Sequence, residues 1–167
     1  MTVLAVTGHM DLTEAGARVV RAALDRLLAR HADAPPVGLS CIAAGADSLF
    51  ADAVLDVGGK LVAVIPSRRY RQEQVSAAQA DTFDRLRAAA HEVIVMPYES
   101  ASSTAYEAAN SLLLDRADRL VAVWDGSART GKGGGTADVV SQARARGIPV
   151  DVVWPRGAER ASRPTGT

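Results

Sequence analysis

The strongest constraint on the fold comes from two short runs in which every residue is apolar, residues 61–65 and 120–124. Side chains of a strand alternate between its two faces, so a fully apolar strand is stable only where both faces are buried. Such strands lie in the middle of parallel sheets that carry helices on both sides. The chain is therefore predicted to be an α/β protein with a mostly parallel central sheet.

Short β-branched runs alternate with longer segments of helical period along most of the chain, which favours a Rossmann-like three-layer sandwich of about six strands with helices on both faces. Thr13 is placed to cap the first helix. The pattern predicts strands at residues 3–7, 37–43, 60–65, 92–96, 120–124 and 150–154. Helices are predicted from Thr13 onward and at residues 47–57, 76–90, 103–117 and 136–146.

The length of 167 residues fits one domain, which we expect to span residues 1–155, followed by a flexible tail at 156–167 that is rich in Arg, Gly, Ser, Pro and Thr. Cys41 is the only cysteine, so no internal disulfide can form. No apolar run is long enough to span a membrane, and the chain opens on a strand rather than a signal peptide. We therefore expect a cytoplasmic protein with no membrane partner.

The charge balance argues against a nucleic-acid partner. The formal net charge is zero and aromatic residues make up only 4% of the chain. Single-stranded nucleic acid is usually bound by a positively charged groove with stacked aromatic side chains. A small ligand is the partner that this composition favours.

Ligands of open parallel sheets bind at the carboxyl ends of the strands, so the loops after the strands are the places to search. Thr7, Gly8 and His9 end the first strand; Gly8 permits close backbone approach and His9 supplies a titratable group. The second strand is followed by a run of small and polar residues that opens a helix, where the helix dipole favours an anion. In this run Asp47 or Ser48 could instead cap the helix. The candidate residues of the run are Gly45, Ala46, Asp47 and Ser48.

A glycine-rich loop at residues 125–136 is the strongest local feature of the chain. Gly133, Gly134 and Gly135 lead into a predicted helix, and consecutive glycines there form a nest of amide donors for a phosphate. Thr136 could cap the helix or donate to the ligand, and Asp125 could accept from a ligand hydroxyl.

Several common site motifs are absent. Residues 126–132 match the start of a P-loop, but the next residue is a glycine where magnesium needs Ser or Thr, which argues against a nucleotide triphosphatase. The dinucleotide fingerprint is missing after the first strand, and the three histidines show no metal-ligand spacing. No cofactor and no metal are therefore expected.

Taken together, Thr7-Gly8-His9, Ala44-Gly45-Ala46-Asp47-Ser48 and Gly134-Gly135-Thr136 are similar to motifs of the SLOG superfamily. This group of Rossmann-like domains is named for the Smf (DNA-processing protein A) and "lonely guy" phosphoribohydrolase families. The resemblance covers the chain up to about Pro155. It implies binding of a nucleotide or nucleotide-derived ligand, often as a sensor, and it implies a homodimer.

Two functions stay open at this point. In the first, the chain is a binding or sensor domain in which residues 133–136 hold a phosphate, while Gly8, His9 and residues 45–48 line the sugar side. In the second, it is an N-glycosidic hydrolase or transferase acting on a nucleoside or its 5′-monophosphate. The enzymatic relatives carry Gly-Thr-x-x-Glu at the last helix, whereas here Asp138 stands one position early. The carboxylate would then be Asp138 or Glu107; the catalytic residues are otherwise unknown.

Overall fold

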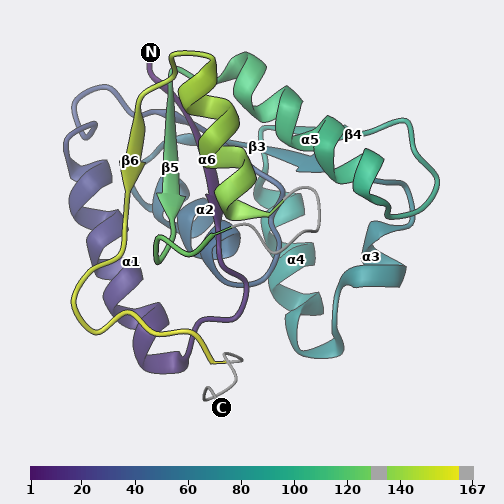
Figure 1. The fold of residues 1–167 in the computed structure, drawn as a ribbon, viewed down its shortest axis with the longest axis horizontal. Helices are drawn as coiled ribbons and strands as arrows, with labels where there is room; N and C mark the ends of the chain where they lie inside the picture. The colour runs from purple at the N-terminus through teal and green to yellow at the C-terminus, as the bar shows by residue number, and fades with distance from the viewer. Residues whose placement is uncertain (129–134, 162–167) are drawn as a thin grey trace.

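The computed structural model describes residues 1–128 and 135–161, and its strands form one six-stranded parallel sheet in the order β4-β3-β2-β1-β5-β6 (Figure 1). The predicted fold class, a Rossmann-like α/β sandwich, is confirmed. The strands are β1 (Val3–Gly8), β2 (Val37–Ser40), β3 (Lys60–Ile65), β4 (Glu92–Val95), β5 (Arg119–Val123) and β6 (Val150–Val152).

All five predicted helices are present, and one further short helix, α3, follows β3. None of the described helices is long and apolar enough to cross a membrane. The helices are α1 (Glu14–Ala29), α2 (Ala46–Asp56), α3 (Tyr70–Gln74), α4 (Ala77–Ala89), α5 (Ser103–Arg116) and α6 (Thr136–Ala145).

Strand β2 ends three residues earlier than predicted because the backbone turns at Ile42. This residue has a φ of 49°, which lies in the left-handed region. The Ser40 hydroxyl accepts a hydrogen bond from the Ile42 amide at 3.0 Å and donates one to the Asp47 carbonyl, also at 3.0 Å. These two bonds replace the sheet pairing and direct the chain into α2.

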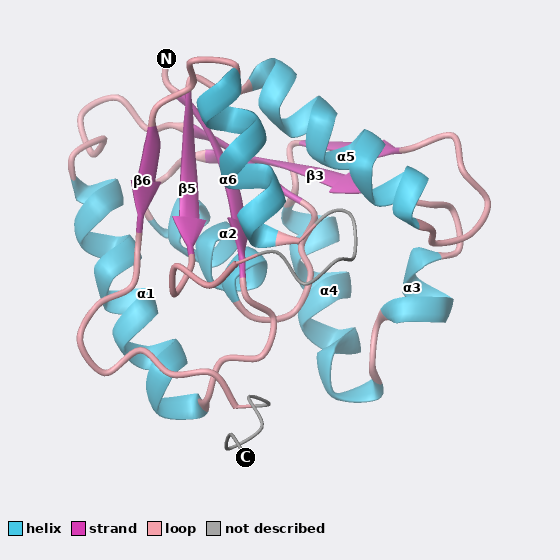
Figure 2. Cartoon of the chain, viewed as in Figure 1, coloured by secondary structure: helices cyan, strands magenta, loops and turns pink. Residues whose placement is uncertain are grey.

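Side chains of β1 alternate between two cores, as expected for a strand buried on both faces. Leu4 and Val6 pack with apolar residues of α1 and α2, whereas Ala5 packs with apolar residues of α5 and α6. A third cluster places α4 beside α2 on the first face. The result is the three-layer arrangement seen in Figure 2, with α5 and α6 on one side of the sheet and α1, α2 and α4 on the other.

The order of the strands reverses between β1 and β5, where the last residue of β1, Gly8, is paired with Val123. Glycine is required here because a Cβ on Gly8 would lie 2.4 Å from the Ala46 Cβ and 2.8 Å from the Val123 Cβ. The start of α2 thus packs directly on the end of β1. Ligand crevices of open sheets form at such a switch point.

The C-terminal segment at residues 156–161, which the sequence analysis assigns to a flexible tail, contacts the start of α1. Arg160 forms a β-bridge with Leu12, and the Thr13 amide donates to the Glu159 carbonyl at 3.0 Å. Gly16 allows this close approach, because a Cβ there would lie 2.7 Å from the same carbonyl oxygen. The rest of the predicted tail, residues 162–167, lies outside the described residues.

The contact between β2 and α2 gives a first testable prediction. A Cβ on Gly38 would lie 2.6 Å from the Val54 Cγ2, so Gly38→Ala should lower the free energy of unfolding by about 1–3 kcal/mol through overpacking. Because Val54→Ala removes the obstructing carbons, the double variant should lose less stability than the sum of the two single variants. Urea unfolding of the four proteins measures this coupling, and strictly additive losses would contradict the packing.

Candidate functional site

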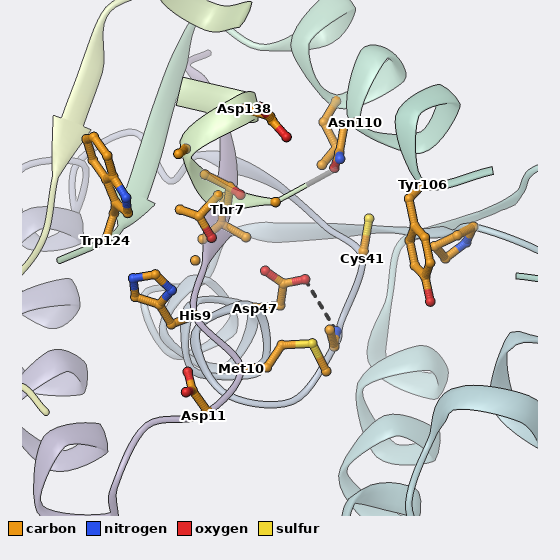
Figure 3. A pocket seen from close by; sticks show the side chains of 18 of the residues that line it. Thr7, His9, Met10, Asp11, Cys41, Asp47, Tyr106, Asn110, Trp124 and Asp138 are labelled. Atoms are coloured by element: carbon orange, nitrogen blue, oxygen red, sulfur yellow. Dashed lines mark hydrogen bonds between the residues drawn. The ribbon is translucent and has the colours of Figure 1, made fainter. Parts of the chain in front are cut away.

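A pocket of about 500 Å³ opens at the carboxyl edge of the sheet, beside the switch point between β1 and β5 (Figure 3). Its wall is built from the loops that follow β1, β2, β3 and β5, from the first turn of α6, and from residues of α3 and α5. Segments that are far apart in the sequence meet here because parallel strands all end at the same edge.

Six of the residues that the sequence singles out lie together in the wall of this pocket. They are Thr7, Gly8, His9, Asp47, Gly135 and Thr136. Gly133 and Gly134 lie outside the described residues, so the structure says nothing about their part in a phosphate nest.

Four other predicted residues do not line the pocket but contact the loops that form its wall. Gly45 packs against the backbone of the loop after β1, and the Ala46 amide donates to the His9 carbonyl at 3.1 Å. The Ser48 hydroxyl donates to the Ala43 carbonyl at 2.6 Å and accepts from the side chain of Gln79 at 2.9 Å. The fourth residue, Asp125, contacts His9.

Asp47 faces the pocket from the first turn of α2. One of its carboxylate oxygens, Oδ2, accepts from the Ala43 amide at 3.4 Å, and within the described residues no donor reaches Oδ1. The carboxylate therefore holds the loop amide of Ala43 through one of its oxygens. Burial raises the pKa of Asp47 to about 7, an effect that the hydrogen bond from Ala43 partly offsets.

His9 and Asp125 form a buried pair, with Nε2 of the ring 3.1 Å from the Asp125 carboxylate and 3.2 Å from its backbone amide. Burial, followed by the nearby Arg160, lowers the pKa of His9 from 6.5, so the ring is neutral at pH 7. Burial opposes ionisation of Asp125, but hydrogen bonds from Ser127 and His9 hold the pKa of its carboxyl below its usual range. The ring of Trp154 packs edge-on against His9 with centroids 5.6 Å apart.

Arg160 reaches the pocket from the C-terminal segment and was not singled out by the sequence. Its Nε donates to the Asp11 carboxylate at 2.9 Å, and its Nη1 lies 3.7 Å from Asp125. It is the one Lys or Arg among the described residues of the wall. The sequence signal was hidden because the residue stands in a stretch with the composition of a tail.

The first turn of α6 opens into the pocket through Gly135, Thr136 and Ala137. Its N-cap residue is Gly135, and within the described residues no side-chain hydrogen bond caps this helix. The helices α1, α4 and α5 are capped by the hydroxyls of Thr13, Ser76 and Ser102, which accept from the amide three residues ahead. Within the described part of the chain, the amides at the start of α6, like those of α2, therefore lack the partner that a Ser or Thr cap provides in α1, α4 and α5.

The two carboxylates considered for catalysis lie in different places. Asp138 is 8% exposed and lines the pocket from α6. Glu107 is exposed on α5 and is not part of the wall. Among the residues that the structure describes, no group of three His, Cys, Asp or Glu side chains could hold a metal ion.

The segment after β3 contributes the aromatic ring of Tyr70, at the start of α3, to the pocket wall, and its arginines lie elsewhere. Tyr70 is 4% exposed and lines the pocket. The side chain of Arg71 forms two hydrogen bonds with Asp84, both at 2.7 Å, and Arg68 lies 3.5 Å from Glu99. These arginines therefore make exposed ion pairs outside the pocket wall.

Comparison with solved structures shows which proteins share this fold. The chain superposes on DNA processing protein A (DprA) from Streptococcus pneumoniae with a TM-score of 0.67 at 20% identity, covering 91% of this chain and 50% of that one. The Moco carrier protein from Chlamydomonas reinhardtii gives 0.57 at 20% identity, with 95% and 80% covered. The chain shares the Rossmann-like fold of these two proteins. Protein TM1055 has the same fold, with a TM-score of 0.58 at 18% identity and 90% and 72% covered.

The chain thus spans half the length of that DprA structure. No protein-family model matches the chain, and no curated protein does. At these identities the SLOG likeness concerns the fold, and the pocket must be interpreted from its own residues.

The raised pKa of Asp47 predicts a pH-dependent stability. Between its ordinary value of 3.8 and about 7, the folded protein binds a proton that the unfolded chain does not, so the free energy of unfolding falls as the pH rises through this range. Asp47→Asn stays neutral and keeps an acceptor for Ala43. Between pH 4 and pH 8, the free energy of unfolding of this variant should rise relative to that of the wild type by on the order of 1–3 kcal/mol.

Urea unfolding at several pH values measures this difference. Asp33→Asn is the matched control because Asp33 is exposed in the loop before β2, and it should follow the wild-type pH profile. If the free energies of unfolding of wild type and Asp47→Asn differ by the same amount at pH 4 and at pH 8, Asp47 is not held in a desolvated site.

Proposed function

We propose that the pocket binds a nucleotide or a nucleotide-derived phosphorylated ligand, with the phosphate at the N-terminus of α6. The observation that carries this proposal is the first turn of α6, which opens into the pocket and has no side-chain cap from the residues that the structure describes. Exposed amides and the positive end of the helix dipole favour an anion at such a position. The volume of about 500 Å³ is within the range of small-molecule pockets.

The polar groups beside α6 are suited to the sugar of such a ligand. Oδ1 of Asp47 is an acceptor that faces the pocket, and Thr7 lines the wall beside it (Figure 3). A sugar hydroxyl can donate a hydrogen bond to this oxygen. Arg160 adds the positive charge that the described part of the wall otherwise lacks.

The solved relatives support a small ligand. Two of them are named as a molybdenum cofactor binding protein from Rippkaea orientalis, which matches at 17% identity with a TM-score of 0.55, and the Moco carrier protein from Chlamydomonas reinhardtii. The same fold therefore holds a small ligand in other proteins, which strengthens the proposal by analogy.

DNA processing protein A from Helicobacter pylori, a further relative with a TM-score of 0.53 at 14% identity, is described as binding single-stranded DNA. Three carboxylates line the pocket of the present chain: Asp11, Asp47 and Asp138. The described wall holds only one arginine to offset these carboxylates. Such a wall disfavours a nucleic-acid strand, which carries a phosphate at every nucleotide. The charge of the described wall thus favours a ligand with few phosphates.

The position of Asp138 favours a second candidate function. Its carboxylate is buried in the pocket wall, close in sequence to the amides that would hold a phosphate, as an N-glycosidic hydrolase or transferase acting on a nucleoside 5′-monophosphate would require. Release of free base from a nucleoside monophosphate, abolished in Asp138→Asn, would establish this activity. Binding without release of base would leave the pocket as a binding or sensor site.

The proposed phosphate position predicts the effect of a new carboxylate. Ala137→Glu places a negative charge in the first turn of α6, so it should weaken binding of adenosine or guanosine 5′-monophosphate by about 10- to 100-fold, the loss expected for one charge-assisted hydrogen bond. Isothermal titration calorimetry measures the dissociation constants, and thermal stabilisation by the same ligands gives an independent readout.

Ala78→Glu is a matched control because Ala78 is exposed at the same position in the first turn of α4, outside the pocket. It should bind both monophosphates as the wild type does. Equal affinity in wild type and Ala137→Glu, or no binding of either monophosphate to the wild type, would overturn the proposed function.

A further inference from the structure

One face of α5 forms a wall of the pocket that the proposed phosphate and sugar contacts do not use. Tyr106, Asn110 and Leu113 all line the pocket, and residues three and four apart share one face of a helix. Figure 3 shows Tyr106 and Asn110 projecting from α5 toward the pocket. This face presents an aromatic ring and an amide side by side.

The ring of Tyr106 is held in place by the aromatic core behind it. It packs edge-on against Tyr70, with centroids 6.4 Å apart and an angle of 81° between the rings. Tyr70 is 4% exposed and packs in turn on the fully buried Phe83, with centroids 6.0 Å apart. Tyr106 itself is half-buried, so it keeps part of its surface for the pocket.

Two of the residues that line the pocket with Tyr106 carry no charge. Cys41 and Pro66 line the pocket together with Tyr106. Burial, with a smaller contribution from Asp47, raises the pKa of the Cys41 thiol, which therefore stays protonated and apolar at neutral pH. Figure 3 shows Tyr106 and Cys41 on one side of Asp47, and His9 and Trp124 on the other.

We infer that the Tyr106 side of the pocket binds a flat heteroaromatic ring of the ligand by stacking, with the Asn110 amide beside the polar edge of that ring. This inference rests on the proposed function for the position of the phosphate. The ligand then lies with its phosphate at α6, its hydroxyl-bearing part at Asp47 and its ring at α5. Aromatic side chains stack on any base because every base has a π-face, so Tyr106 selects for the presence of a ring.

The test compares two probes that differ only in the ring. Adenosine 5′-monophosphate and ribose 5-phosphate share the sugar phosphate, so the ratio of their dissociation constants isolates the contribution of the base. In the wild type the monophosphate should bind about 5- to 100-fold more tightly, as base stacking on one aromatic side chain predicts. Tyr106→Ala should bring this ratio close to one while leaving the affinity for ribose 5-phosphate unchanged.

Three further variants make the result specific. Tyr106→Phe keeps the aromatic face and should keep the wild-type ratio, whereas Tyr106→Leu fills the space without an aromatic face and should lose it. The control Tyr98→Ala removes a half-exposed tyrosine that does not line the pocket, and it should leave the ratio unchanged. Should Tyr106→Ala not fold, the Leu variant gives the same comparison.

The outcomes separate this inference from the proposed function. A wild-type ratio near one, or a ratio that persists in Tyr106→Ala or Tyr106→Leu, would overturn the stacking site. If ribose 5-phosphate still bound to the wild type and Ala137→Glu still weakened its binding, the phosphate position would stand without the ring position. If neither probe bound to the wild type, both proposals would be overturned.

Discussion

All the strands of this sheet run in one direction, and the rest of the structure depends on that constraint. Parallel strands place every strand-to-helix loop at one edge, so the helices that follow begin there with their positive ends toward the same space. The strand order reverses between β1 and β5, and the pocket lies beside this reversal. Gly8 at the end of β1 allows the start of α2 to pack directly against it, beside the pocket.

A chain of charged groups fixes the rim around this edge. Asp11 holds Arg160, Arg160 approaches Asp125, and Asp125 accepts from Ser127 and contacts His9. The low pKa of both His9 and Asp125 means that this network contains a neutral ring and an ionised carboxylate at pH 7. These groups are engaged with one another, so the contacts that we propose for a ligand are made by α6, Asp47 and α5.

The sequence was sufficient for the fold because its signals are local. Apolar runs mark the buried strands, and Thr13 caps α1 through the Gly16 amide as its position predicts. The early end of β2 was missed because it depends on the left-handed backbone of Ile42, which nothing in the local sequence requires. The helix α3 was missed because its five residues are too few to show a helical period.

The candidate site was only partly predictable from the sequence, for a different reason. Glycines and polar residues after strands point to the edge of the sheet where the pocket lies. They do not show which side chains already have hydrogen-bond partners there, as Ser48 has in Ala43. Arg160 and Asp11 are separated by 149 positions, so their contact leaves no pattern in the sequence. Tyr106 lies on a helix without a strongly apolar face, and only the tertiary structure shows that its ring faces the pocket.

The central claim is that the first-turn amides of α6 receive the phosphate of a ligand. Amide chemical shifts of isotope-labelled protein, followed by NMR during titration with adenosine 5′-monophosphate, test it most directly. The account predicts that the amide resonances of Gly135, Thr136 and Ala137 shift most, while those at the capped start of α5, residues 103–105, stay in place. Saturable shifts that leave the α6 amides unchanged would contradict it.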